Sequence, residues 1–280
     1  MDLQQKLSHL FNLNYDIVAE YLVKRLREYI AESGKKGGIV GVSGGIDSAV
    51  VATLLSRATH NYFFLLLPSS STPARDVQDA LELTEMLGGR DKREVVEIDG
   101  IVREVGSRVK SEDPLVLGNA KARIRMTLLY AFAQKLDYLV IGTGDKSEIL
   151  LGYFTKYGDG GVDVLPIGDL YKTQVRLLGR HLGVPEKIVT KPSSPALWEG
   201  QTAEGELGLS YEVADAILYS RFEEMKGPEE VAKELGVDIS LVRRVDELVM
   251  RSQHKRLPPE IFRLSGRAIN SDWRYPRAWA

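Results

Sequence analysis

The chain has 280 residues, of which 44% are hydrophobic and 27% are charged, as in ordinary globular proteins with a hydrophobic core. Its formal net charge is −2, so it has no basic field to hold nucleic acid or an anionic membrane. It has no cysteine, which excludes disulfides, Cys-ligated zinc, iron–sulfur clusters and cysteine nucleophiles. The longest purely apolar stretch, residues 62–67, is too short to span a bilayer, and the first residues do not resemble a signal peptide, so we expect a cytoplasmic protein.

Short apolar strands alternate with helices through the first half of the chain. Residues 1–33 form a helical lead-in of two segments, with Asn14 as the N-cap between them. The following strands and helices are expected in this order: strand 39–42, helix 47–56, strand 63–67, helix 74–87, strand 95–98, helix 101–110, helix 120–135 and strand 138–142. This alternation predicts a doubly wound parallel α/β sheet with helices on both faces and a ligand site beyond the carboxyl ends of the strands.

Two irregular stretches follow, and helices then resume. Residues 152–163 are rich in glycine and polar side chains, and residues 190–205 contain two prolines. We expect both stretches to be mobile without ligand and to close over the reacting groups when substrates bind. Trp198 in the second stretch can stack on a base or anchor the loop by packing. The later helices are expected over residues 207–218, 228–235 and 239–252.

The turn after the first strand has the sequence Ser43-Gly44-Gly45-Ile46-Asp47-Ser48. Backbone N–H groups and a helix N-terminus at such a turn can surround a phosphate. It is not a Walker A loop, which ends in Gly-Lys-Ser or Gly-Lys-Thr. Asp47 would act through a bound Mg²⁺, because a bare carboxylate repels phosphate. The alternative is an ordinary turn in which Asp47 is a helix N-cap.

This motif resembles the signature of the ATP pyrophosphatases, which cleave ATP between its α and β phosphates and transfer AMP to an oxygen nucleophile. Further segments, taken in order, resemble the ammonia-dependent NAD synthetases: residues 119–126, 142–148, 152–161 and 254–259. The string Phe-Thr-Lys-Tyr-Gly-Asp-Gly-Gly in the third segment is very specific to that family. The resemblance runs from residue 39 to 259 and implies an adenine nucleotide α hydrolase-like fold.

The resemblance also implies a single NAD synthetase domain over residues 1–280. Within it, an ATP pyrophosphatase core over residues 38–190 follows the lead-in, and C-terminal helices occupy residues 206–257. A homodimer with the deamido-NAD site at the subunit interface is implied as well. The implied reaction is amidation of deamido-NAD: its carboxylate attacks the α-phosphate of ATP, Mg²⁺ stabilises the departing pyrophosphate, and ammonia displaces AMP from the adenylate. Ammonia is expected to be used directly, because the glutamine amidases attached to related enzymes need a cysteine nucleophile.

Carried over by motif, the resemblance assigns residues to each ligand. The residues implied for ATP are Gly41, Val42, Ser43, Gly44, Gly45, Ile46, Asp47, Ser48, Thr143, Lys172 and Ser194. Those implied for deamido-NAD are Arg123, Lys156, Asp163, His254 and Lys255, and those implied for Mg²⁺ are Asp47 and Glu148. Asp47, Lys172 and Lys156 are the expected catalytic residues, the two lysines as positive charges for phosphate or for the pentacovalent centre.

General considerations support part of this assignment. Glu148 follows the strand that ends at Gly142 by about one helical turn, so its carboxylate can reach the same crevice as Asp47. Apart from any site, the helix dipole favours a carboxylate at this position. Arg123 and Arg125 point in roughly opposite directions on one helix, so at most one of them reaches a given site. The resemblance selects Arg123.

Two other functions fit the residues. Another ATP pyrophosphatase, such as a GMP synthetase subunit or a tRNA-modifying enzyme, would share the phosphate loop. Thiolating members depend on cysteines that are absent here, and the net charge argues against tRNA. A nucleotide-binding regulatory module without turnover would also keep the loop. Release of pyrophosphate that requires deamido-NAD separates the three possibilities.

Overall fold

The computed structural model describes residues 2–198 and 200–267, and at its centre lies a sheet of four parallel strands. The strands are β1 (Gly37–Gly41), β2 (Tyr62–Leu66), β3 (Arg93–Val95) and β4 (Tyr138–Ile141), in the order β3-β2-β1-β4. β1 pairs with both β2 and β4, so that Ile39 lies between Phe63 and Val140. Because the strand order reverses at β1, a crevice is expected beyond the carboxyl ends of β1 and β4.

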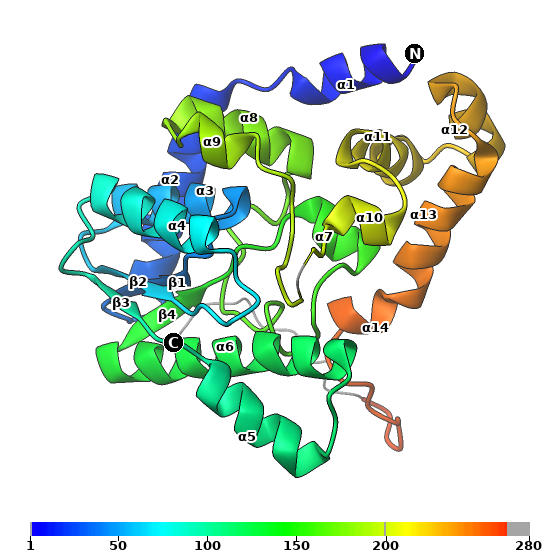
Figure 1. The fold of residues 1–280 in the computed structure, drawn as a ribbon. Coiled ribbons are helices and arrows are strands. Elements are labelled where there is room, and N and C mark those ends of the chain that lie inside the picture. The colour runs from blue at the N-terminus through cyan, green and yellow to red at the C-terminus, as the bar shows by residue number, and fades with distance from the viewer. Residues whose placement is uncertain (1, 199, 268–280) are drawn as a thin grey trace.

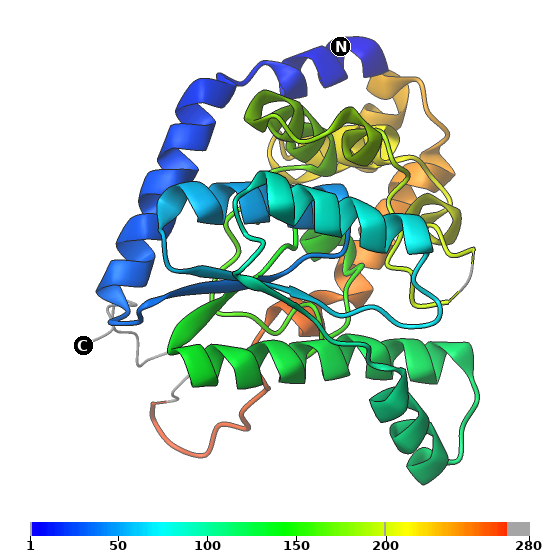
Figure 2. The same ribbon diagram turned by 60° about the vertical axis from the view of Figure 1, so that its left-hand side comes forward.

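Helices cover both faces of the sheet. Apolar side chains of one face pack against α2 (Tyr15–Glu32), α3 (Ile46–Ala58), α4 (Ala74–Met86), α8 (Lys172–Leu182) and α9 (Glu186–Val189). The other face packs against α5 (Asp99–Val109) and α6 (Pro114–Leu136). Figure 2 shows α6 running along one side of the sheet, with α3 and α4 on the opposite side. The expected doubly wound arrangement is therefore confirmed.

A second group of helices lies beside the sheet and has its own apolar cluster, on the right in Figure 1. It contains α1 (Leu3–Phe11), α7 (Lys146–Leu151), α10 (Ala203–Leu207), α11 (Tyr211–Phe222), α12 (Pro228–Leu235) and α13 (Ile239–Arg251), and the short α14 (Gln253–Arg256) follows. α1 is the first helix of the chain, yet it contacts α11 and α12, which come near the other end of the sequence. Strand-end loops of the sheet and this helical group face each other, which places the crevice between them.

Capping groups fix where the first helices begin. Asn14 Oδ1 accepts a hydrogen bond from the N–H of Ile17 at 3.2 Å, so the expected N-cap of the second lead-in segment is confirmed. α6 begins at Pro114, six residues before the expected start at residue 120. Asp113 caps it through the N–H of Leu115, and the proline occupies the first turn, where its missing N–H costs nothing.

The helix expected over residues 207–218 is present as α11, but its expected start is wrong, because Leu207 belongs to the preceding helix α10. α10 ends at Leu207, and Gly208 then adopts a φ of +79°, a left-handed conformation that stops the helix. Ser210 caps the new helix α11 through the N–H of Val213. The sequence Gly-Leu-Ser therefore carried both the stop and the restart signals.

None of the helices over the described part of the chain is long and apolar enough to cross a membrane. The expected division into a lead-in, a core over 38–190 and C-terminal helices over 206–257 stays a prediction. Within the expected domain of 1–280, residues 1, 199 and 268–280 lie outside the described residues.

Candidate active site

A cavity of about 490 Å³ lies beyond the carboxyl ends of β1, β2 and β4. Its wall includes the glycine-rich turn after β1, residues 65–68 at the end of β2 and residues 141–143 at the end of β4. Parts of both irregular stretches, 152–163 and 190–205, complete the wall from the side of the second helical group. The expected position of the ligand site at the strand ends is thus matched by a cavity of a size suited to a nucleotide.

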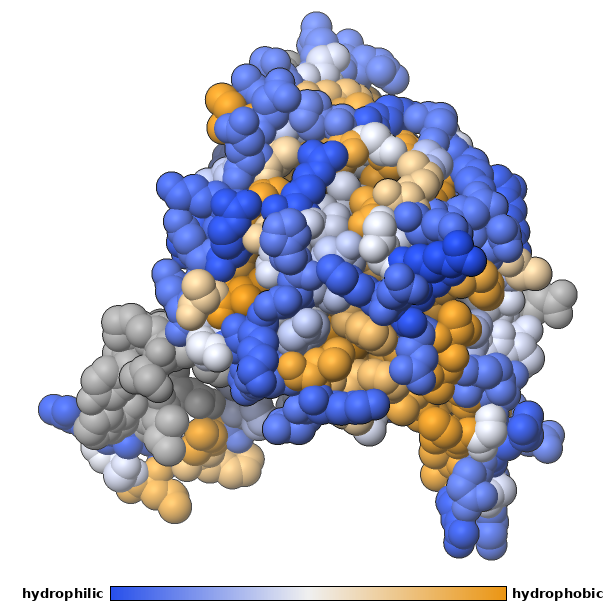
Figure 3. All heavy atoms as spheres, turned by 90° about the vertical axis from the view of Figure 1, so that its left-hand side faces the viewer, coloured by the Kyte–Doolittle hydropathy of each residue, from blue (hydrophilic) through white to orange (hydrophobic). Residues whose placement is uncertain are grey.

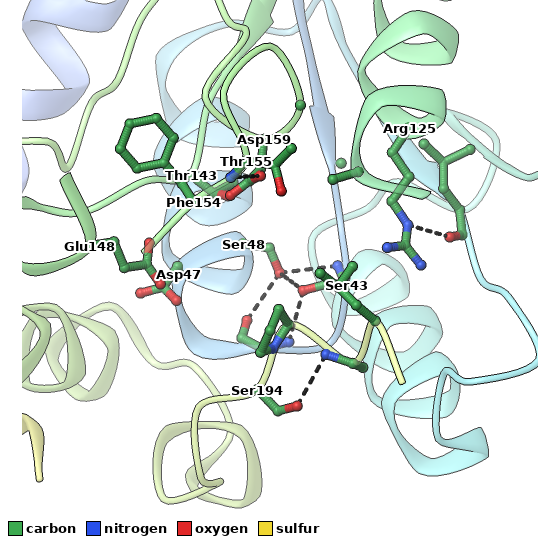
Figure 4. Close-up of a pocket in the computed structure, with 18 of the residues that line it drawn as sticks. Ser43, Asp47, Ser48, Arg125, Thr143, Glu148, Phe154, Thr155, Asp159 and Ser194 are labelled. Carbon is green, nitrogen blue, oxygen red and sulfur yellow. Dashed lines mark hydrogen bonds between the residues drawn. The ribbon is translucent and has the colours of Figure 1, made fainter. Parts of the chain in front are cut away.

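The glycine-rich turn is held by its own hydroxyl groups, which Figure 4 shows facing each other. Ser48 Oγ donates to the carbonyl of Gly45 at 3.0 Å and accepts from the N–H of Ser43 at 3.1 Å. Gly44 has a φ of +83°, and a Cβ there would lie 2.1 Å from the carbonyl oxygen of Asp76. Only glycine therefore fits at this position.

The turn leads directly into α3, and its residues line the cavity. The N-cap of α3 is Gly45, so the alternative in which Asp47 is an ordinary N-cap is wrong. Among the residues implied for ATP, the turn and β1 supply Gly41 to Ser48, of which all but Gly44 line the cavity. Thr143 and Ser194 line it as well. Ser194 Oγ donates to the carbonyl of Gln201 at 2.5 Å, which folds the 190–205 segment on itself.

Three carboxylates from two helices and a capping turn surround the ammonium group of Lys172. Its Nζ lies 2.6 Å from Asp47 Oδ2, 2.8 Å from Glu148 Oε1 and 3.0 Å from Asp145 Oδ2. The side chains of Lys172 and Asp145 are fully buried, and those of Asp47 and Glu148 are 19% and 21% exposed. The structure therefore brings Asp47 and Glu148, implied for Mg²⁺, into direct contact with Lys172, implied for ATP.

Burial and charge oppose each other in this cluster. Burial raises the pKa of Asp145 to about 6, although Lys172 pulls it down, and burial likewise raises the pKa of Glu148. Burial alone would lower the pKa of Lys172, but Asp145, Asp47 and Glu148 together raise it well above its usual value. Lys172 is therefore a permanent cation that is fully buried against Asp47 and Glu148, which line the cavity, while Lys172 itself is not among the lining residues.

Asp215 of α11 does not contact Lys172 itself but binds the residues next to this cluster. Its Oδ1 accepts from Ser147 Oγ at 2.5 Å, and its Oδ2 accepts from the N–H of Thr173 at 2.9 Å. Ser147 Oγ in turn accepts from the N–H of Lys172 at 2.9 Å. Because Ser147 lies on α7 and Lys172 begins α8, the fully buried Asp215 joins the two helices that carry Glu148 and Lys172.

The residues implied for deamido-NAD do not converge in the same way. Lys255 lines the cavity, and its Nζ donates to the carbonyls of Gly152 and Phe154 at 2.7 and 2.8 Å. Asp163 accepts from Tyr130 Oη at 3.0 Å. It lines an adjoining cavity of about 420 Å³, which shares Glu148 and Lys255 with the first.

Arg123, Lys156 and His254 lie outside both cavities. Arg123 and His254 are exposed, and Lys156 Nζ donates to the carbonyl of His254 at 2.8 Å. Arg125, two residues along α6, does line the first cavity, and its Nε donates to the carbonyl of Leu67 at 3.0 Å. The assignment of Arg123 to deamido-NAD stays a prediction.

The 190–205 segment, of which Glu199 lies outside the described residues, forms part of the cavity wall. The ring of Trp198 lies near Gly118 of α6, and Trp198 also lines the cavity, so both expected roles, packing and stacking on a base, stay predictions. Lys121 Nζ donates to the carbonyl of Leu197 at 2.8 Å and to Ser71 Oγ at 2.8 Å. These bonds tie the segment to α6, and its mobility without ligand stays a prediction.

Sequence reasoning did not single out Asp145 or Asp215, and it considered Arg125 but selected Arg123 instead. Asp145 was inside a segment already noted, and its place as N-cap of α7, with Glu148 three residues later, is a capping box that the sequence displays. Asp215 is far from the motifs in sequence, so no local signal points to it. Arg125 becomes distinct from Arg123 only once the face of α6 toward the cavity is known.

Comparison with known proteins supports the motif-based resemblance. Residues 18–259 match the family model NAD synthase. The chain is 64% identical over 268 residues to the NH(3)-dependent NAD(+) synthetase of Saccharolobus solfataricus, covering 96% of each chain. It is 65% identical over 267 residues to the protein of the same name from Sulfurisphaera tokodaii, covering 95% of this chain and 96% of that one.

Two solved structures share the fold over 90% of this chain and 100% of their own. NMN synthetase from Francisella tularensis has a TM-score of 0.81 at 35% identity. NH3-dependent NAD synthetase from Campylobacter jejuni has a TM-score of 0.77 at 32% identity. The adenine nucleotide α hydrolase-like fold expected from the motifs is confirmed, and the chain belongs to the NAD synthase family.

Proposed function

We propose that this chain catalyses the ATP-dependent amidation of deamido-NAD by ammonia, with release of NAD, AMP and pyrophosphate. The observation that carries the proposal is the buried cluster of Lys172, Asp47 and Glu148 beside the phosphate loop. Family membership and the names of the curated relatives supply the reaction class. The near full-length identity to these relatives argues against a GMP synthetase subunit, a tRNA-modifying enzyme or a module without turnover.

In the first step, the phosphate loop and the N-terminus of α3 bind the phosphates of ATP. Lys172 is fixed by three carboxylates, so its charge is in place before the substrate arrives and no energy is needed to orient it. A preorganised cation stabilises the negative charge that develops while the nicotinate carboxylate attacks the α-phosphate and pyrophosphate leaves. Lys255, which lines the cavity, and Lys156 are the cations that we assign to deamido-NAD.

The residues present fit a Mg²⁺ ion. Three carboxylates against one ammonium leave an excess of negative charge in the cluster, and Asp47 Oδ1 is buried without a hydrogen-bond partner among the described residues. No set of three His, Cys, Asp or Glu side chains able to hold a metal by itself occurs among the residues described. This fits an ion held by Asp47 and Glu148 together with the substrate phosphates. When bound, Mg²⁺ would neutralise charge on the leaving pyrophosphate.

In the second step, ammonia attacks the acyl carbon of the adenylate, the C–O bond to AMP breaks and the amide forms. The 152–163 and 190–205 stretches would exclude water, which otherwise competes with ammonia for the adenylate. Ammonia is the reactive form, so the rate at a fixed total of ammonium should rise with pH until groups of the enzyme titrate.

A homodimer is part of the proposal. Arg123 and His254 are exposed and lie outside both cavities, so a second chain could bring the rest of the site to them. Figure 3 shows hydrophobic side chains gathered at the base of the protruding α5. Exposed apolar side chains on α5 and at the start of α6 are Ile101, Val109, Leu115 and Val116. Apolar patches of this kind are typical of subunit interfaces. The cytoplasmic location also stays a proposal.

The decisive experiment mixes purified chain with ATP, Mg²⁺, ammonium and one acceptor at a time. Pyrophosphate and NAD should form with deamido-NAD. Because a solved relative is named NMN synthetase, nicotinate mononucleotide is the acceptor to test against it. A higher kcat/KM with the mononucleotide, or equal NAD formation when glutamine replaces ammonium, would overturn the proposed substrate or nitrogen donor. Pyrophosphate release without any acceptor would overturn the reaction itself.

A further inference from the structure

Lys191 is a charged residue on the cavity wall for which the proposed reaction has no role. It stands near the start of the 190–205 segment, and its side chain is 15% exposed. Its Nζ donates to the carbonyl of Gly44 at 3.0 Å, to Asp76 Oδ1 at 2.7 Å and to Asp79 Oδ2 at 2.5 Å. An ammonium has three N–H donors, so all of them are used. The side chain is therefore held in one place.

The carbonyl of Gly44 belongs to the peptide that joins Gly44 to Gly45. In a trans peptide the C=O and the N–H point in opposite directions, so a bond that holds this carbonyl also orients the N–H of Gly45. Gly45 lines the cavity and is the N-cap of α3, where N–H groups can bind phosphate. A peptide between two glycines rotates at little steric cost. Within the loop its N–H makes one long hydrogen bond, to Ser43 Oγ at 3.3 Å, and Lys191 holds the carbonyl end of the same peptide from outside the loop.

We propose that Lys191 is a positioning residue for ATP, which holds the Gly44–Gly45 peptide in its phosphate-binding orientation and ties the 190–205 segment to the phosphate loop. The inference rests on the proposed function, because it requires ATP to bind at this loop. Asp76 and Asp79, both on α4, hold the ammonium group. Three parts of the chain that are distant in sequence therefore meet at one nitrogen atom.

Lys187 of α9 provides a matched control. Its Nζ lies 2.8 Å from Asp79 Oδ1 and also pairs with Glu82, and neither partner belongs to the phosphate loop. Lys187→Met and Lys191→Met each remove one cation from Asp79, but only Lys191→Met releases the carbonyl of Gly44. A general effect of charge at Asp79 would therefore appear in both variants.

The experiment measures steady-state kinetics with ATP and deamido-NAD varied separately, and competition by adenosine, which has no phosphate. Loss of a charge-assisted hydrogen bond predicts a rise in KM for ATP of about 10- to 100-fold in Lys191→Met. The KM for deamido-NAD and the inhibition constant of adenosine should change less than about twofold. Lys187→Met should leave all three constants within about twofold of wild type. Lys191→Arg, which keeps N–H donors, should recover most of the affinity for ATP.

Several results would overturn the inference. These are an unchanged KM for ATP in folded Lys191→Met, an equal rise in Lys187→Met, or an equal loss of adenosine binding. Thermal unfolding checks that each variant is folded, and Lys191→Gln, which is shorter and uncharged, replaces Lys191→Met with the same expected rise if the latter does not fold. Wild type that releases no pyrophosphate with deamido-NAD would instead refute the proposed function, so the two failures are distinguishable.

Discussion

The ATP side and the deamido-NAD side of the site differ in how their charged residues are held. On the ATP side, Lys172 is fully buried and makes three short ion pairs. On the other side, Arg123 and His254 are exposed, and Lys156 makes no ion pair among those described: it donates to a backbone carbonyl and lies over the ring of Tyr157. The first half is preorganised within one chain, whereas we expect the second half to assemble through a loop movement or with another chain. The predictions below test this difference.

The largest effect is expected at the ATP side. Asp47→Asn and Glu148→Gln each remove a negative oxygen from the cluster, so each should lower kcat for pyrophosphate release by about 100- to 1000-fold and weaken binding of magnesium–ATP. Asp169→Asn is the control, because the side chain of Asp169 is 97% exposed and pairs only with Lys146 among the ion pairs described. Near-normal pyrophosphate release by either variant removes that residue from the site.

Lys172→Met and Lys156→Met should affect different properties, because Lys172 lies on the ATP side of the site and Lys156 on the deamido-NAD side. Lys172→Met leaves buried carboxylates without their cation, so the free energy of unfolding should fall by about 3 kcal/mol, in addition to a large loss of kcat. Lys156→Met should raise the KM for deamido-NAD by about tenfold at unchanged stability. Urea denaturation and kinetics measure both. Equal stability losses in the two variants would contradict the contrast between a buried and an accessible lysine.

Arg123→Ala should raise the KM for deamido-NAD by about tenfold without affecting folding, because the side chain is exposed. If Arg123 serves the site of the second chain, mixed dimers of Arg123→Ala and Asp47→Asn contain one site with both defects and one with none. Mixing and refolding the two variants should then restore about one quarter of wild-type activity at low deamido-NAD. No restoration would mean that Arg123 does not act across an interface.

The smallest effect is a change in the pH dependence of stability. Burial raises the pKa of Asp215 to about 7. The native state then holds this proton to a higher pH than the unfolded chain does, so the stability it contributes is present at low pH and is lost as pH rises from about 4 to about 7. Asp215→Asn cannot titrate, and it should reduce the pH dependence of the unfolding free energy by up to one proton in this window.

Urea denaturation at about pH 5 and about pH 7.5 tests this, with Asp169→Asn as the control whose slope should match wild type. A slope in Asp215→Asn that equals the wild-type slope would show that Asp215 is not the group that titrates. Kinetics of the same variant report whether the hydrogen bonds of Asp215 to α7 and α8 are needed for turnover.

Much of the fold followed from local patterns in the sequence. Asn14 was correctly placed as an N-cap, because a cap acts through its own N–H partners a few residues away. The start of α6 was missed, although Asp113 and Pro114 are also local signals, because the apolar periodicity was given more weight than the cap. The break at Gly208 was missed for the same reason.

The site residues also differ in whether local sequence or long-range contacts identify them. The phosphate loop could be predicted because its strand, glycines and helix are contiguous, and Glu148 because it follows the next strand end by one helical turn. Asp215, Lys191 and Arg125 could not be assigned in this way, because each meets its partners only through contacts between distant segments. Lys191 and Gly44, for example, are 147 positions apart in the sequence.

The sequence alone determined which elements form, the order in which they alternate, and the chemistry of the loop between β1 and α3. These depend on spacing, capping and residue type, which act over a few positions. The tertiary structure alone decided that Lys172 is enclosed by Asp47, Asp145 and Glu148, and that Arg123 faces outward. Burial and charge pairing depend on neighbours in space, which long-range packing sets after the local elements have formed, and the pKa values of the cluster follow from that packing.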